Sequence, residues 1–249
     1  MKELQVSDEK IDRLLRATPA PELSTDLSGK ISGRLTASLH PVKPMPGTRV
    51  LAVQFAAVFL VLAMALIGMM GITGFRSLHF WQATGIVAIL ALGVTLLAVA
   101  LAWQIRPGSL KKIPAHVSWL CFGLGFLTGA ALLFPWKSAE GWVSPDFVAH
   151  GIPCLLTGSA VAVPSGILFW MLSRRGIALS GAAFGGSLGA IAGLLGITVL
   201  QFRCIYQNAA HLMVWHGGIL LVTIAAGALL GRVLLRNPKG RTSEGMGVS

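Results

Sequence analysis

The chain has 249 residues, of which 54% are hydrophobic and only 12% are charged. A soluble globular protein carries about 25% charged residues, so this composition excludes an ordinary water-soluble domain, and it excludes disorder over most of the chain. The net charge of +11 would suggest nucleic-acid binding on a soluble protein, but here its meaning depends on where the basic residues lie. The composition predicts a polytopic membrane protein.

Residues 1–49 are predicted to form a cytoplasmic tail with two short amphipathic helices. The first begins near Ser7, and the second repeats an apolar residue every four positions from Leu23. The tail is too short and too polar to form its own core, which suits it to folding on a partner. The alternative is a helix lying on anionic lipid, which eight basic against six acidic residues disfavour. The expected partner-binding residues are Ile11, Leu14, Leu15, Leu27, Ile31 and Leu35.

Six apolar stretches follow the tail, and each is long enough to cross a membrane. A helix needs about 20 apolar residues to span a hydrocarbon core of about 30 Å. Unpaired backbone groups are costly in lipid, so each stretch should be helical. Residues 50–235 therefore predict an all-α fold, a bundle of six transmembrane helices, which the cytoplasmic C-terminal tail 236–249 follows. The stretches are 50–71, 80–103, 117–134, 152–172, 177–200 and 212–235.

The basic residues indicate the orientation of the bundle. Seventeen of the twenty lie in the two tails, in the second and fourth connections or at the end of the last span, and the other three are Arg76, Lys137 and Arg203. Positively charged connections stay in the cytoplasm, so both termini are predicted to be cytoplasmic. The same asymmetry accounts for the net charge without direct binding of nucleic acid.

The predicted spans contain little that could perform chemistry. None carries an acidic or basic residue at mid-membrane, and there is no phosphate-binding loop or catalytic spacing, so an enzyme or an ion-coupled pump is disfavoured. Gly181, Gly185, Gly189 and Gly193 are four residues apart and form a stripe that permits close helix packing. Packing within the chain is favoured over a dimer face, and the oligomeric state is left open.

Two of the three cysteines fall on the predicted outer side. Cys154 opens the fourth span and Cys204 lies between the last two, whereas Cys121 is expected to be a small buried hydrophobe. In an oxidising compartment Cys154 and Cys204 could form a structural disulfide. A redox-sensing or metal-binding pair is the alternative.

Three histidines accompany these cysteines, so the candidate ligands for zinc or another soft metal are His150, Cys154, Cys204, His211 and His216. Their spacing matches no standard zinc finger. His211 and His216 are five residues apart and do not share one face of an α-helix, so at most one of them is expected to point into a site.

Together these features resemble the NrsF-like anti-sigma factors, the negative regulators of sigma F of the bacterial inner membrane. The resemblance is carried by the tail ending HPVKPMPG, the RPG after the second span, Cys154 in GIPCLLTG, and Cys204 before HLMVWH. It implies a six-helix inner-membrane protein whose tail sequesters an extracytoplasmic-function sigma factor. It also implies that Cys154 and Cys204 are a sensing pair for stress such as heavy metal. The histidines beside Cys204 favour a metal over thiol chemistry alone.

Two other functions compete with this one. A small transporter or metal-handling membrane protein could use the same residues as an entry site, and a continuous polar path through the bundle would favour it. A thiol–quinone oxidoreductase is the second, and the lack of a C-x-x-C pair argues against it.

Overall fold

The computed structural model describes residues 29–30, 32–34, 36, 46–105, 115–135, 145–173 and 180–235. The chain divides into two compact units, Met1–Pro44 and Met45–Ser249. In the first unit the described residues are helical, and Thr36 Oγ1 donates a hydrogen bond to the Ser32 carbonyl at 2.8 Å. The C-terminal tail lies outside the described residues, as do all six expected partner-binding positions, Ile11, Leu14, Leu15, Leu27, Ile31 and Leu35.

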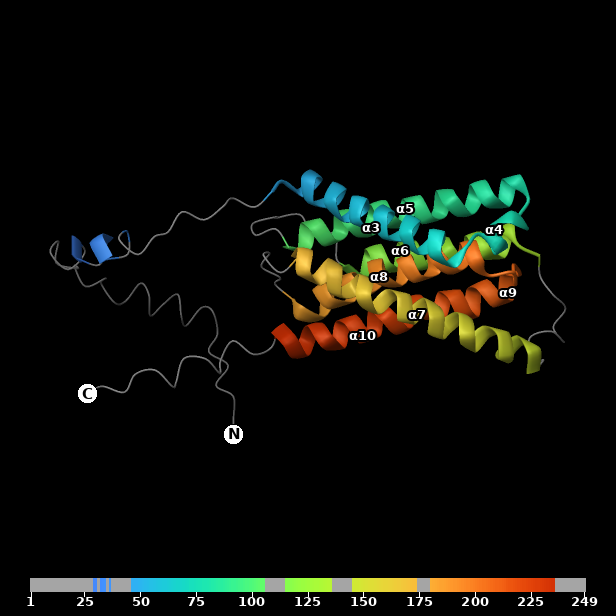
Figure 1. The fold of residues 1–249 in the computed structure, drawn as a ribbon. Helices are drawn as coiled ribbons and strands as arrows, with labels where there is room; N and C mark the ends of the chain where they lie inside the picture. The colour runs from blue at the N-terminus through green and yellow to red at the C-terminus, as the bar shows by residue number, and fades with distance from the viewer. Residues whose placement is uncertain are drawn as a thin grey trace, which may run out of the picture. The chain divides into compact units, whose positions relative to one another are not determined.

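The second unit is a bundle of long helices (Figure 1). Short elements occupy two of the connections at one end, and among the described residues there is no strand, which confirms the all-helical fold. The long helices are α3 (Thr48–Met70), α5 (Phe80–Ile105), α6 (Ala115–Leu133), α7 (Pro145–Ser173), α8 (Gly181–Arg203) and α10 (Gly217–Leu235). The short elements are α4 (Thr73–Arg76), α9 (Ala209–His211) and the π-helix η2 (Leu212–His216).

Five of these helical segments are long and apolar enough to cross a membrane: Thr48–Met70, Phe80–Ile105, Asp146–Ser173, Gly181–Arg203 and Ala209–Leu234. Among the described residues, the apolar helix within α6 is shorter, Val117–Leu133. At about 1.5 Å per residue, the 19 residues of α6 extend about 29 Å, close to the thickness of a typical hydrocarbon core. The chain is thus a helical membrane protein, and the sixth span and the orientation of the termini stay predictions.

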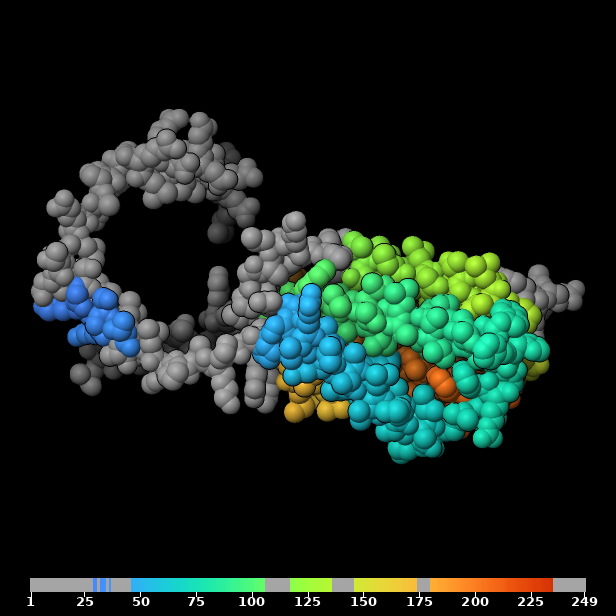
Figure 2. Space-filling model, turned by 90° about the horizontal axis from the view of Figure 1, so that it is seen from above, coloured from blue at the N-terminus to red at the C-terminus, as the bar shows by residue number. Residues whose placement is uncertain are grey.

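Helix α8 occupies the centre of the bundle. In its apolar window 94% of the residues are buried, against 17–50% in the other four spans. It packs against α3, α5, α6, α7 and α10, which surround it. Seen from above, α3, α5 and α6 cover most of one face, and only a small orange part of the later helices shows between them (Figure 2). The central position follows from the glycines of α8, because a helix with little side-chain volume can be approached from several sides.

The glycine stripe packs within the chain, as expected from the sequence. A Cβ atom on Gly185 would overlap the backbone of Gly227 in α10, and one on Gly189 would overlap the backbone of Thr223. The two helix backbones therefore touch along this stripe. By contrast, a Cβ atom on Gly125 in α6 would have no atom within 4 Å.

The connection after α3 covers one end of α8. A Cβ atom on Gly74 in α4 would overlap the backbone of Cys204, so α4 lies directly against this cysteine. The guanidinium of Arg203 donates a hydrogen bond to the carbonyl of Met70, the last residue of α3. The end of α8 that leads to Cys204 is thus attached to the end of α3.

Candidate functional site

Four side chains converge at this end of the bundle: Cys154, Cys204, His211 and His216, called here the Cys/His group. Their ligand atoms all lie within 4.8 Å of one another. The two sulfur atoms are 3.7 Å apart, and Cys204 Sγ is 3.6 Å from His211 Nε2. Cys154 comes from α7, Cys204 follows α8, and the two histidines belong to α9 and η2. The group therefore joins three consecutive parts of the bundle.

The π-helix explains how both histidines reach the group. Residues 212–216 form one π-helical turn, in which hydrogen bonds connect residues five apart, so His211 and His216 lie above one another. Their ring centroids are 5.5 Å apart. In an α-helix the same residues would be turned by about 140°. The expectation that at most one of them points into the site is wrong, because it assumed regular α-helical geometry.

His216 has buried polar atoms without a partner. Its side chain is 0% exposed, and within the described part of the chain neither ring nitrogen has a hydrogen-bond partner. His211 is 2% exposed and Cys204 is 6% exposed. Buried polar atoms are nearly always bonded, and leaving one unpaired costs about 1–3 kcal/mol. A cation bound by the group would give His216 the missing partner.

Two distances within the group match those between the ligands of a four-coordinate divalent ion. A tetrahedral zinc ion has Zn–S bonds of about 2.3 Å and Zn–N bonds of about 2.0–2.1 Å, which places two sulfur ligands about 3.8 Å apart and a sulfur and a nitrogen about 3.6 Å apart. The corresponding distances here are 3.7 Å and 3.6 Å. The Cys/His group could therefore hold a metal without large rearrangement.

The two cysteines also suit thiol chemistry. The contact with Cys154 Sγ lowers the pKa of the Cys204 thiol from its ordinary value; burial opposes this effect, and His211 and His216 add to it. A lowered pKa favours the thiolate, which is the form that binds a metal or attacks an oxidant. A disulfide has an S–S bond of about 2.05 Å, so modest side-chain movement would join the two sulfurs.

Aromatic side chains that were not predicted from the sequence lie against the site. The ring of Phe147 meets His211 edge-on with centroids 6.4 Å apart, and it lies 5.6 Å from Trp215. The ring of Tyr206 lies 5.8 Å from that of His211. Trp215 packs where a Cβ atom on Gly151 would be, which keeps α7 close to η2. No sequence motif marks these residues, because their roles depend on how α7 meets η2.

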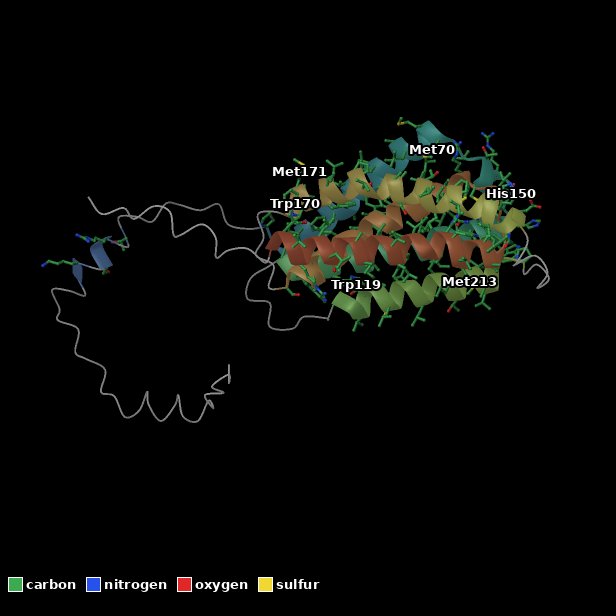
Figure 3. All side chains as sticks on the ribbon, turned by 90° about the horizontal axis from the view of Figure 1, so that it is seen from below. Met70, Trp119, His150, Trp170, Met171 and Met213 are labelled. Carbon is green, nitrogen blue, oxygen red and sulfur yellow. The ribbon has the colours of Figure 1, made fainter. Side chains whose placement is uncertain are left out.

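The structure does not bring His150 into the Cys/His group. This residue is exposed, its Nδ1 lies 2.7 Å from the Asp146 carbonyl, and its ring lies 4.3 Å from that of Tyr206. It lies near one end of the bundle, with Met70, whereas Trp119 and Trp170 lie toward the other end (Figure 3).

Cys121 is exposed on α6, and the expectation that it is buried is wrong. The reason is that α6 is apolar on all sides, so its sequence does not distinguish a face packed on the bundle from a face turned to lipid.

Comparison with known proteins identifies the family. A family model described as "NrsF: Negative regulator of sigma F" matches residues 35–237. No curated protein and no solved structure matches the chain. The family match covers most of the chain, including every long helix and all four members of the Cys/His group. The chain therefore belongs to the NrsF family of negative regulators of sigma F.

Proposed function

We propose that this protein is a membrane-anchored anti-sigma factor of the bacterial inner membrane. Its tail, residues 1–49, would sequester an extracytoplasmic-function sigma factor, and the Cys/His group would receive a metal or redox signal on the opposite, periplasmic side. The observation that carries the proposal is the convergence of two thiols and two imidazoles, one with both nitrogens unpartnered, in a chain that belongs to a family of sigma-factor regulators.

The interior of α8 favours a sensor over a transporter. Between Ser187 and Thr198, this helix carries only apolar residues and glycines, among them Ile191, Leu194 and Ile197, which are fully buried. The polar side chains near Ser187 bond to one another, since Gln104 Nε2 donates to Ser187 Oγ at 2.7 Å and Trp119 Nε1 donates to it at 3.1 Å. This apolar stretch separates the polar residues near Ser187 from those near Cys204, which supports a protein that transmits a change of packing rather than an ion.

The mechanism requires two packings of similar free energy. An ion that binds the Cys/His group in one packing only, or a disulfide that forms in one only, shifts the equilibrium by its differential affinity. A coupling of about 1–3 kcal/mol changes the affinity for the bound sigma factor about 5- to 150-fold. α7 contributes Cys154 alone, so binding at the group changes how strongly α7 is held to α8 and η2.

The tail's role is tested with the full-length chain and its sigma factor in membranes. We expect replacement of Ile11, Leu14 and Leu15 by Asp to lower retention of the sigma factor in the membrane fraction more than tenfold. Burying one such side chain is worth about 1.5–3 kcal/mol, and about 1.4 kcal/mol is tenfold in affinity. Immunoblots of the membrane and soluble fractions measure the effect. Gln5→Asp is the matched control, since it adds a negative charge outside the apolar pattern, and retention by the triple variant equal to wild type would contradict the proposal.

The orientation is tested separately. Ile205 is 59% exposed and adjoins Cys204, so we expect Ile205→Cys to react with a membrane-impermeant maleimide in intact cells. Labelling is read by mass shift on a gel, with the wild-type chain and its three native cysteines as the background. If Ile205→Cys is labelled only after lysis, this end of the bundle faces the cytoplasm and the proposed geometry is wrong.

A further inference from the structure

Cys154 is half-buried, whereas the other three members of the Cys/His group are buried, so an ion that reaches the two histidines from outside needs a route. His211 and His216 are almost fully buried. The ring of Phe147 meets that of His211 edge-on and also contacts Trp215. The ring of Tyr206, itself partly exposed, lies against that of His211 with centroids 5.8 Å apart. Tyr206 is therefore a half-exposed side chain in direct contact with a buried imidazole.

His150 lies against the same tyrosine ring. The ring centroids of His150 and Tyr206 are 4.3 Å apart, with the planes tilted by 39°. His150 is four residues before Cys154 in α7, so both project from the same face of that helix. The ring of Tyr206 therefore contacts both an exposed imidazole and a buried one.

The hydrogen bond of His150 determines which of its nitrogens can bind a cation. Its Nδ1 lies 2.7 Å from the Asp146 carbonyl oxygen. A carbonyl only accepts, so Nδ1 carries the proton and Nε2 carries the lone pair. Metal-binding histidines usually have their second nitrogen held in this way, which fixes the tautomer and the ring orientation. His150 is thus oriented as a ligand although it lies outside the Cys/His group.

We propose that His150 is the capture ligand of this site. Its Nε2 binds a divalent cation of the zinc type at the outer surface, and the ion then passes to His211 and Cys204 as the Tyr206 ring turns aside. The transfer exchanges one coordinate bond for others without electron transfer, and protons displaced from the thiols leave to water. This inference rests on the proposed metal-binding role of the Cys/His group.

The test separates the rate of binding from its equilibrium. A capture ligand that is absent from the final site speeds entry and exit equally, so its loss lowers the association and dissociation rate constants by the same factor. We expect His150→Phe to lower both about tenfold, which is a rise of about 1.4 kcal/mol in the barrier to transfer, and to leave Kd unchanged. The phenylalanine keeps the ring contact with Tyr206 and removes the nitrogens.

The measurement uses the full-length, reduced protein in detergent with Co²⁺ alone as the probe. Stopped-flow absorbance of the thiolate–cobalt band gives the association rate, release to an excess of chelator gives the dissociation rate, and chelator competition gives Kd. Tyr206→Phe is the matched control, because it retains the ring and should bind at the wild-type rate.

Each other outcome has a distinct meaning. Wild-type rates in His150→Phe would overturn the capture role while leaving the metal site intact. A weaker Kd with an unchanged association rate would show that His150 is a ligand of the final site, which also overturns the proposal. If the wild-type protein binds no Co²⁺, the metal-binding role itself is wrong, and the capture role with it.

Discussion

Replacing His216 by leucine is expected to lower the affinity of the protein for Zn²⁺ or Co²⁺ by at least about 100-fold, because loss of an outer-shell partner alone costs 10- to 100-fold and His216 is a direct ligand in the proposed site. The side chain is fully buried, and its two ring nitrogens have no hydrogen-bond partner among the described residues. Chelator competition on the purified, reduced protein measures the affinity.

The same variant distinguishes a ligand from a structural residue. Leucine fills similar space without an unpaired polar atom, so the metal-free variant should be at least as stable as wild type. Cys121→Ser is the control for thiol content, since Cys121 is exposed and lies outside the Cys/His group. Unchanged metal affinity in His216→Leu, or an equal loss in Cys121→Ser, would rule out the proposed ligand set.

The contact between α8 and α10 should be the most sensitive to added volume. We expect Gly185→Ala to lower the free energy of unfolding by about 1–3 kcal/mol, because the new Cβ overlaps the carbonyl of Gly227 and the backbones must separate. Unfolding in mixtures of dodecylmaltoside and sodium dodecyl sulfate, followed by circular dichroism, measures the change.

Gly125→Ala makes the same chemical change in open space within α6. It should be neutral or stabilising by about 0.4–1 kcal/mol, because alanine restricts the unfolded chain. Equal effects at Gly125 and Gly185 would mean that helix propensity, and not close packing, determines the loss.

Much of the fold follows from apolar run length alone. Lipid leaves no alternative to helix for a long apolar stretch, and the four-residue spacing of the glycines predicts a close contact whichever partner supplies it. The partner, α10, is not encoded in that spacing. Nor is the exposure of Cys121, because in a bilayer both the packed and the lipid-facing sides of a helix are apolar.

The site was predictable in composition but not in geometry. Topology placed Cys154 and Cys204 at one level, and the structure brings their sulfurs to 3.7 Å. The π-helical turn η2 contains one residue more than an α-helical turn, so His216 lies on the same side of the helix as His211. No local sequence pattern predicts such a turn. The expected metal ligand His150 is instead engaged with Asp146 and Tyr206.

The hydrogen bond between Arg203 and Met70 joins the end of α8 beside the Cys/His group to α3, the helix that follows the tail. The tail enters the bundle through α3, and α3 packs on the same α8 that ends beside Cys204. In the proposed mechanism, a displacement of α8 would reach Thr48 through α3, a helix of 23 residues that packs directly on α8. If the Cys/His group lies on the outer side, as proposed, two neighbouring helices already link it to the start of α3, and no relay of successive side chains is needed.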